Sequence, residues 1–191
     1  MNTNATLSDI KASLPDYAKD LRLNLDSVLS ESGAQGLNAK QIAIIAIASA
    51  VSARHEPLTS AIVGQFAGTL SDSEFNAARA AAAIMAMNNI YYRFTHLVGN
   101  EEYATMRAGL RMNVMANPGC DKVDFELASL AVSAVNGCGM CMESHEKTLQ
   151  KHGVAAQAIQ SAVKIAAVLH AVAVVAEQAR AAERGATELA A

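Results

Sequence analysis

The sequence predicts an all-α protein. Hydrophobic residues make up 52% of the 191 residues, whereas aromatic residues make up only 4%, and the chain has no Trp. Alanine dominates the apolar residues, and it favours the helix more than any other residue does. Runs of β-branched and aromatic residues, which favour strands, are sparse. A chain of this length can bury a sizeable core, and we expect residues 1–191 to form a single domain.

The first half of the chain carries start and stop signals for four helices. Asn38 with Gln41 and Ser71 with Glu74 have the spacing of capping boxes, and Gly33 follows an apolar periodic segment as a stop signal. The expected helices are Tyr17–Leu29, Ala39–Ala53, one whose first turn contains Pro57, and one from Ser71 to Asn88 or beyond.

The second half predicts three more helices after a polar connection. The segment Gly99–Gly119 is more polar than its surroundings and ends in the turn signal Asn117-Pro-Gly. Gly153 marks the point where the middle helix of the three should end. The expected helices are about Asp124–Val135, about Gly139–Lys151 and about Ala155–Arg184.

The two halves show a weak internal repeat. Shifted by 84 positions, Ser49-Ala-Val51 falls on Ser133-Ala-Val135, and each half contains an apolar helix, a short helix and a long alanine-rich helix. The repeat divides the domain into a degenerate first half, about residues 17–98, and an active second half, about residues 120–186. Chance matches between alanine-rich helices are the alternative explanation.

The charge and hydropathy patterns argue against nucleic-acid and membrane binding. The net charge is −3 and the pI about 5.9, with no basic stripe and no Lys/Arg-rich amphipathic helix. The longest apolar runs, Ile42–Val51 and Ile165–Ala176, are shorter than the roughly 20 residues that span a bilayer. The N-terminus lacks the basic and apolar regions of a secretory signal, so we expect a cytoplasmic, reducing environment.

The segment from Asn136 to His145, NGCGMCMESH, contains two of the three cysteines and one of the five histidines. Asn136-Gly137 suits the end of one helix, which places Cys138 just before, and Cys141 within, the first turn of the next. The unpaired N–H groups and the dipole at a helix start stabilise a thiolate, the reactive form of cysteine. Both sulfurs can form a disulfide, and His145 lies one turn after Cys141. The pattern therefore favours redox chemistry.

Three other interpretations of the cysteine pair remain open. A zinc site would use Cys138, Cys141 and His145, but a closed structural site needs four ligands, and only Cys120 could add a thiolate. A structural disulfide is disfavoured in a reducing cytoplasm. Two inert core thiols are disfavoured by the flanking glycines and Glu143. Cys120 itself follows a turn, matches no motif and is expected to be a free loop thiol.

Two further ionisable residues lie in apolar segments. Glu126 is either an ordinary acid in the first turn of a helix, which the residues alone favour, or a group that faces the same cleft as His145 and orients its imidazole. His170, within an alanine- and valine-rich helix, is expected in the core, and a place in the cleft is the alternative. The Met residues are expected to be core filler.

On these residues the chain resembles the alkyl hydroperoxide reductase D family, which belongs to the carboxymuconolactone decarboxylase-like superfamily. The family signature is a Glu, a CxxC motif twelve residues later and a His four residues after the second Cys. Glu126, Cys138, Cys141 and His145 fit this spacing without a gap. Further matching segments are Met87-Asn-Asn-Ile-Tyr-Tyr-Arg93, Gly109-Leu-Arg-Met-Asn113, Ala116-Asn-Pro-Gly119 and Ser133-Ala-Val-Asn-Gly-Cys138. The resemblance covers essentially the whole chain.

The resemblance implies an all-helical subunit with two superposable halves, one of them active, that assembles into a homotrimer. It implies an antioxidant enzyme that reduces alkyl hydroperoxides with its CxxC motif, without a bound cofactor or a metal. Dihydrolipoamide, carried by a lipoyl-bearing acyltransferase, is the implied reducing co-substrate. A peroxiredoxin, the C subunit of the same reductase system, is an implied partner.

Two alternatives to this function stay open. One is a dithiol adaptor that transfers electrons to the peroxiredoxin and has only incidental peroxidase activity. The other is a non-redox, decarboxylase-like enzyme of the same superfamily, which the intact cysteine pair disfavours.

The resemblance also implies roles for the residues of the motif. Cys141 is the implied peroxidatic thiolate, which becomes a sulfenic acid, and Cys138 is the implied proton donor that then resolves it as a Cys138–Cys141 disulfide. Glu126 and His145 are the implied proton relay. The local pattern alone favours Cys138 as the nucleophile, because the N-terminal thiol is expected to be more exposed. Met140 stands where some relatives carry a second His, so that imidazole is absent here.

Overall fold

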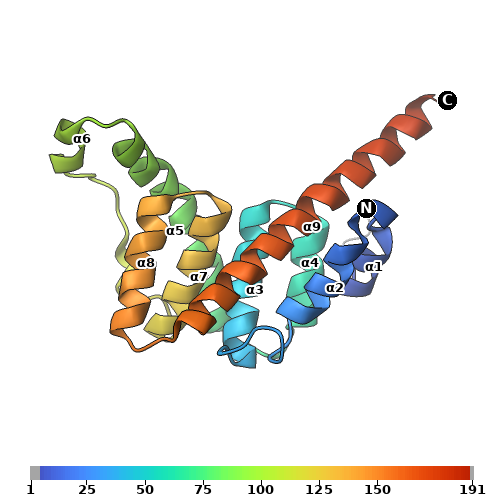
Figure 1. Ribbon diagram of the computed structural model, residues 1–191, viewed down its shortest axis with the longest axis horizontal. Coiled ribbons are helices and arrows are strands. Elements are labelled where there is room, and N and C mark those ends of the chain that lie inside the picture. The colour runs from blue at the N-terminus through green and yellow to red at the C-terminus, as the bar shows by residue number, and fades with distance from the viewer. Residues whose placement is uncertain (1–4, 190–191) are drawn as a thin grey trace.

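The regular structure of the described chain is helical throughout, which confirms the all-α prediction (Figure 1). The computed structural model describes the backbone of residues 5–189 and the side chains of residues 5–181. Residues 1–4 and 190–191 of the expected domain lie outside the described residues. The elements are α1 (Leu7–Ser13), η1 (Asp16–Ala18), α2 (Lys19–Val28), α3 (Ala39–Ala53), α4 (Glu56–Gln65), α5 (Asp72–Leu97), α6 (Glu101–Thr105), η2 (Asn113–Met115), α7 (Lys122–Val135), α8 (Gly139–Lys151) and α9 (Ala156–Leu189), where η denotes a 3₁₀ turn.

The core is built around α3, which is buried on every side. All residues from Ile42 to Ala50 are buried. Helix α3 packs on α5, α7 and α9, and α5 and α9 also pack on α7. A helix that is apolar all round is stable only when other elements cover it. The position of α3 at the centre therefore follows from its sequence.

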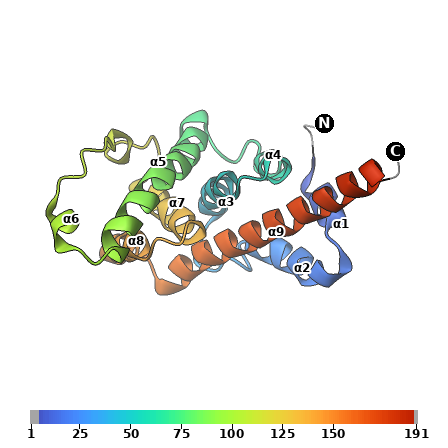
Figure 2. The same ribbon diagram turned by 90° about the horizontal axis from the view of Figure 1, so that it is seen from above.

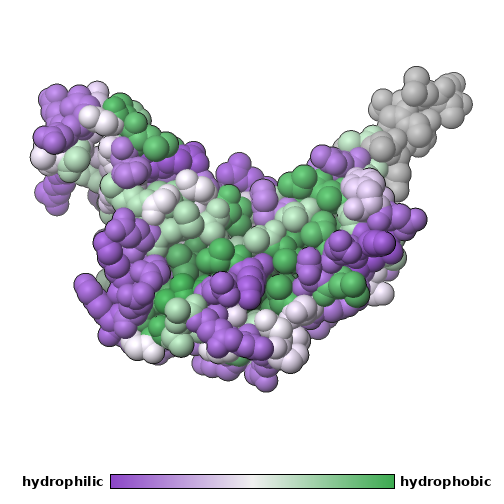
Figure 3. Space-filling model, viewed as in Figure 1, coloured by the Kyte–Doolittle hydropathy of each residue, from purple (hydrophilic) through white to green (hydrophobic). Residues whose placement is uncertain are grey.

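Two arms project from this centre. Figure 1 shows α5 and α6 on one side and the C-terminal end of α9 on the other, and Figure 2 shows α1 and α2 beside α9. Apolar residues gather on the surface between the arms and near the end of α5 (Figure 3). The arm of α5 extends the helix past the core, so that its C-terminal half lies beside α8.

The apolar run Ile165–Ala176 lies within helix α9, which is much longer than the run. Ala156–Ala181 is long and apolar enough to cross a membrane by length and composition, but 50% of its most apolar window is buried inside the protein. Helix α9 packs on α2, α3 and α7. The core helix of a globular protein passes the same test of length and composition.

The capping signals locate the helix starts correctly. Asn38 with Gln41 and Ser71 with Glu74 form complete capping boxes at the starts of α3 and α5. The prediction for Tyr17–Leu29 is only partly right, because the chain there forms a 3₁₀ turn before α2 begins. Helices α1 and α6 were not predicted, since elements of 7 and 5 residues are too short to show a helical period.

The helix order supports the expected repeat, which stays a prediction. Helices α7, α8 and α9 begin 83, 83 and 84 residues after α3, α4 and α5. We propose that the two halves, about residues 17–98 and 120–186, are superposable copies of one three-helix unit.

Candidate active site

The turn between α7 and α8 places the two cysteines as the sequence predicts. Asn136 is the C-cap of α7, and Gly137 follows with a φ of 70°, a left-handed conformation that glycine adopts without strain. Cys138 is the N-cap of α8, and its sulfur accepts a hydrogen bond from the backbone N–H of Cys141 at 3.3 Å. The positive end of the helix dipole therefore lies at the cysteine pair.

The two sulfurs are joined as a disulfide, with 5.3 Å between the Cα atoms of Cys138 and Cys141. Cys138 is 0% exposed and Cys141 is 6% exposed. The expectation that Cys138 is the more exposed thiol is therefore wrong. The reason is that an N-cap side chain turns back over the helix backbone, whereas Cys141 faces a cavity.

Cys120 is the free loop thiol that the sequence predicts, and it is half-buried. It donates a hydrogen bond to the carbonyl of Asp121 at 3.3 Å. Burial, with a further contribution from Asp124, raises the pKa of this thiol to about 11. This raised pKa keeps the Cys120 thiol protonated at neutral pH, and the thiol is a weaker nucleophile than the thiolate. Within the described part of the chain, no group of three or more His, Cys, Asp or Glu residues is placed to hold a metal ion.

Glu126 reaches His145 across 19 residues of sequence. Oε2 of Glu126 lies 2.7 Å from Nδ1 of His145, and 12% and 8% of the two side chains are exposed. Since α7 begins at Lys122, Glu126 lies past its first turn, so the interpretation of Glu126 as an ordinary first-turn acid is wrong. The packing of α8 on α7 makes the contact, and this packing has no local sequence signal.

The other nitrogen of the imidazole faces a thioether. Nε2 of His145 lies 3.3 Å from Sδ of Met85, a buried residue of α5. The 2.7 Å contact between Nδ1 and the Glu126 carboxylate takes one proton between them, and Nε2 can take a second proton, which the Met85 sulfur can accept in a hydrogen bond but cannot supply. The imidazole is thus held from both sides in one orientation, as a group that moves protons requires.

A cavity of about 580 Å³ lies against Cys141 and His145. Its lining comprises Met85, Asn88 and Tyr92 from α5, Met112, Met115 and Ala116 from the loop before α7, and Met140, Cys141, Ser144 and His145 from α8. The four methionines make its wall apolar, polarisable and adaptable. Met85 also belongs to the hydrophobic core, as expected, whereas Met140 is 36% exposed, so the expectation of core filler is wrong for Met140.

The contribution of α5 is the part of the site that the sequence analysis missed. Asn88 and Asn89 are buried polar residues in an otherwise alanine-rich helix, and this pair is the signal that indicates a specific contact. His170, by contrast, is exposed on α9, so its expected place in the core is wrong. It does not line the cavity, because its helix crosses the other side of α7 from α5.

Comparisons with known proteins identify the family of the chain. The family model described as the carboxymuconolactone decarboxylase family matches residues 101–184. The chain is 53% identical to the alkyl hydroperoxide reductase AhpD of Rhodospirillum centenum over 97% of the chain and 100% of the relative. It is 53% identical to that of Rhodopseudomonas palustris, over 88% of the chain and 92% of the relative, and 52% identical to that of Streptomyces coelicolor, over 88% and 93%. The chain therefore belongs to the alkyl hydroperoxide reductase AhpD family.

Proposed function

We propose that the protein is a CxxC peroxidase that reduces organic hydroperoxides. The observation that carries this proposal is a disulfide-forming cysteine pair at a helix start, whose second sulfur lines the same cavity as a carboxylate-bound imidazole. The relatives with about half of their residues identical are named alkyl hydroperoxide reductase. In the net reaction one hydroperoxide and two thiols give an alcohol, water and a disulfide, so the peroxide gains the two electrons that the thiols lose.

Cys141 supplies the attacking sulfur in this proposal. Its proton passes through the cavity to the pair of His145 and Glu126, and the resulting thiolate attacks the terminal peroxide oxygen. The O–O bond breaks, the alkoxide leaves, and Cys141 becomes a sulfenic acid. Cys141 and His145 line one cavity, which supports this assignment over the choice of Cys138 as nucleophile.

Cys138 resolves the sulfenic acid. It gives its proton to the leaving alkoxide, and its thiolate then attacks the sulfur of Cys141. Hydroxide leaves as water with the proton that His145 and Glu126 hold. The hydrogen bond from the Cys141 N–H to the Cys138 sulfur supports this role, because it stabilises a thiolate at the N-cap.

Dihydrolipoamide is the proposed reducing co-substrate. Its two thiols reduce the protein disulfide by thiol–disulfide exchange and close to the cyclic lipoamide disulfide, so no bound cofactor is needed. We propose that a lipoyl-bearing acyltransferase presents it, that a peroxiredoxin can draw electrons from the same cysteine pair, and that the cycle runs in the reducing cytoplasm. The support is the family to which the chain belongs.

An exposed apolar stripe supports the proposed homotrimer. Ile90, Phe94 and Leu97 on the arm of α5 are 63%, 48% and 72% exposed. They recur at intervals of four and three residues, so they share one helix face. A contiguous exposed apolar face is typical of a surface that another subunit covers.

Mass spectrometry after one equivalent of an organic hydroperoxide tests the proposed chemistry. The reduced protein should form the Cys138–Cys141 disulfide and keep Cys120 free. Cys141→Ser should lower turnover with dihydrolipoamide by at least about 100-fold, because no sulfenic acid forms without the thiolate. Cys120→Ser is the matched control and should leave turnover unchanged. Full activity of the Cys141→Ser protein would sink the proposal.

The same turnover assay separates the adaptor alternative from a peroxidase. A peroxidase consumes hydroperoxide with dihydrolipoamide alone, whereas an adaptor needs the added peroxiredoxin. A negligible rate without the peroxiredoxin, and a high rate with it, favours the adaptor.

A further inference from the structure

We propose that Asn89 and Arg93 of α5 are positioning residues that hold the turn before Cys138, and thereby keep the Cys138 sulfur at the N-cap of α8. Neither residue lies in the half of the chain that carries the cysteines. The proposal rests on the proposed function only for its effect on turnover, because the placement of the sulfur is a property of the fold.

Asn89 connects α5 to Ser133, in the last turn of α7, and to Asn136, the C-cap of α7. It is 1% exposed, and its Nδ2 donates to Oγ of Ser133 at 2.9 Å. Its Oδ1 accepts from Nδ2 of Asn136 at 2.9 Å. Buried amides of this kind are costly to leave unpaired, and removal of Asn89 takes a hydrogen-bond partner from the Ser133 hydroxyl and from Nδ2 of Asn136.

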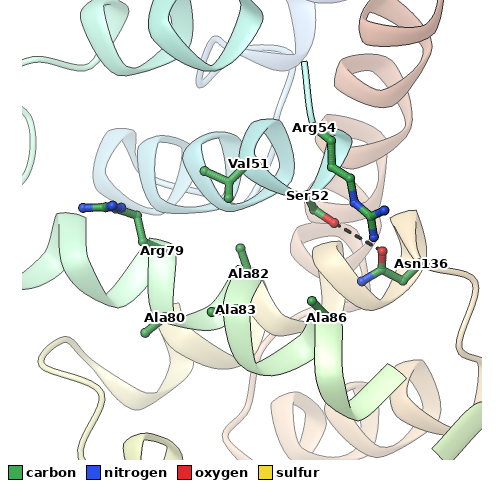
Figure 4. Close-up of a pocket in the computed structure, with 9 residues that line it drawn as sticks. All are labelled: Val51, Ser52, Arg54, Arg79, Ala80, Ala82, Ala83, Ala86 and Asn136. Carbon is green, nitrogen blue, oxygen red and sulfur yellow. Dashed lines mark hydrogen bonds between the residues drawn. The ribbon is translucent and has the colours of Figure 1, made fainter. Parts of the chain in front are cut away.

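Asn136 is therefore held by three side chains. In addition to Asn89, Ser52 at the end of α3 donates to its Oδ1 at 3.4 Å, and Arg93 donates from Nη1 to its backbone carbonyl at 2.6 Å. Figure 4 shows Asn136 and Ser52 facing each other beside the hollow between α3 and α5, with the Arg54 side chain next to them. A C-cap carbonyl has no partner within its own helix, and Arg93 supplies one.

The turn so held determines where the Cys138 sulfur lies. The backbone N–H of Cys138 donates to the carbonyl of Ser133 at 3.1 Å, and the hydroxyl of Ser133 is the group that Asn89 binds. Gly137 lies between, and Arg93 Nη1 passes 3.9 Å from the position that a Cβ on Gly137 would take. The segment from Ser133 to Cys138 is thus fixed from α5 at Ser133 and at Asn136, and the Ser133 carbonyl in turn holds the N–H of Cys138.

One face of α5 contacts both the imidazole of His145 and the turn before Cys138. Met85, Asn89 and Arg93 follow at intervals of four residues, so they form a single stripe along the helix. Met85 contacts the imidazole of His145, and the other two contact the turn before Cys138. A shift of this stripe would move the imidazole and the Cys138 sulfur together.

The thiol pKa of Cys138 measures this positioning. In a Cys120→Ser, Cys141→Ser background, thiolate absorbance at about 240 nm reports Cys138 alone. Asn89→Ala and Arg93→Met should each raise the Cys138 pKa by about one unit, since the thiolate loses the N–H and dipole at the N-cap. Asn89→Ala changes no charge, so its effect separates positioning from the loss of the Arg93 cation. Glu126 and His145, the ionisable pair of the site, are the same in all of these variants.

Conservative and control variants sharpen the test. Arg93→Lys can still donate to the Asn136 carbonyl and should keep the Cys138 pKa within about 0.3 unit of its original value. Arg79→Met and Asn76→Ala change exposed residues of the same helix and should have no effect. Arg93 is exposed, so Arg93→Met provides a folded variant even where Asn89→Ala unfolds.

With both cysteines present, Asn89→Ala and Arg93→Met should slow disulfide formation after peroxide addition by about tenfold and let a sulfenic acid accumulate, trapped with dimedone. Unchanged Cys138 pKa and unchanged disulfide formation in folded Asn89→Ala and Arg93→Met proteins overturn the inference. A shifted Cys138 pKa in a protein that reduces no peroxide supports the positioning and refutes the proposed function instead.

Discussion

The turn between α3 and α4 and the turn between α7 and α8 have the same backbone plan. In each turn one left-handed residue precedes the next helix, Arg54 with a φ of 59° or Gly137 with a φ of 70°, and in the second turn Asn136 lies between α7 and Gly137. The next residue is in each case the N-cap of the following helix, His55 in the first turn and Cys138 in the second. The two turns are thus alike in conformation and differ in their side chains.

Both N-cap side chains make the same hydrogen bond. Nδ1 of His55 accepts from the N–H of Leu58 at 3.2 Å, and the Cys138 sulfur accepts from the N–H of Cys141 at 3.3 Å. A capping acceptor satisfies an N–H that has no partner within the helix, whatever its chemistry. The local structure therefore needs only an acceptor, and the redox chemistry needs a second sulfur three residues later.

The surroundings of the two turns differ more than the turns themselves. At the offset of 83 residues that pairs these two N-caps, Glu126 and His145 correspond to Ala43 and Ile62, which are both 0% exposed. The first half fills with apolar side chains the positions where the second half carries a proton-sharing pair. N-caps and left-handed residues therefore determine the backbone of such a turn. A few buried side chains around it determine whether the turn is reactive.

The largest difference between the two turns is expected when the N-cap of each is replaced by serine. Cys138→Ser should lower turnover with dihydrolipoamide by at least about 100-fold, because no disulfide can form, while reduced-state stability stays within about 0.5 kcal/mol, since serine is a preferred N-cap. His55→Ser should retain turnover. The measurements are steady-state peroxide consumption and urea unfolding. Comparable turnover losses in both variants would contradict the assignment of chemistry to the second turn.

Glu126→Gln isolates the proton-sharing pair with a smaller effect. The amide keeps the shape of the carboxylate but cannot take a proton, so turnover at neutral pH should fall about 10- to 100-fold, with partial recovery at higher pH where solvent deprotonates the thiol. Asp124→Asn is the control, because Asp124 lies on the same helix and is hydrogen-bonded to Gln41 at 2.9 Å instead. A turnover–pH profile decides, and equal losses in the two variants would exclude a specific role for Glu126.

The parts of the fold and of the site that could be predicted are those with a local sequence signal. The capping pairs at Asn38 and Ser71 and the glycine before Cys138 act within one turn of chain, so the sequence shows them directly. The contact of Glu126 with His145 depends on how α8 packs on α7, and no short-range pattern encodes it. The residues alone offer this contact only as the less favoured alternative, and the family resemblance is what favours it.

The exposure of Cys138 and the role of α5 could not be predicted for the same reason. Burial of the N-cap sulfur results from the helices around it, and the stripe with Asn89 acts across 44 residues of sequence to Ser133. A pair of asparagines in an apolar helix indicates that a polar contact exists, but it does not indicate the partner.

Substitutions at the left-handed residues of the two turns should change the free energy of unfolding in opposite directions. Gly137→Ala should cost about 1–2 kcal/mol, because an L-residue pays that strain in the left-handed region. Space is not the cause, since the nearest heavy atom to an added Cβ is Arg93 Nη1 at 3.9 Å. Arg54→Gly should do the reverse and stabilise by less than about 1 kcal/mol, because relief of strain is offset by the greater freedom of glycine in the unfolded chain.

Urea unfolding of the reduced proteins measures both changes. Gly137→Asn is the control and should cost less than Gly137→Ala, because asparagine tolerates the left-handed region better. A Gly137→Ala protein as stable as the original would show that the turn does not require glycine.

The smallest expected effect compares the capping boxes of α3 and α5. The box of Asn38 and Gln41 is neutral, whereas Glu74 in the second box accepts from Ser71 N at 2.9 Å and pairs with Lys40 at 2.9 Å. The hydrogen bond from the Ser71 backbone, and next the one from Lys40, lower the pKa of Glu74 from 4.5 to about 2. Because the folded-state pKa is depressed, the stabilisation is present above pH 4.5 and is lost as the pH falls toward about 2.

Glu74→Gln should therefore lower the melting temperature by about 2–4 °C at pH 7, and this difference should shrink between pH 4.5 and pH 2. Asn38→Ala, which removes the neutral N-cap, should lower the melting temperature by a similar amount at every pH, because neither asparagine nor its partner N–H titrates. Thermal unfolding of both variants across this pH range measures how the melting temperature of each depends on pH. Parallel pH dependences would mean that the charge of Glu74 contributes nothing, and that both helix starts are stabilised by hydrogen bonding alone.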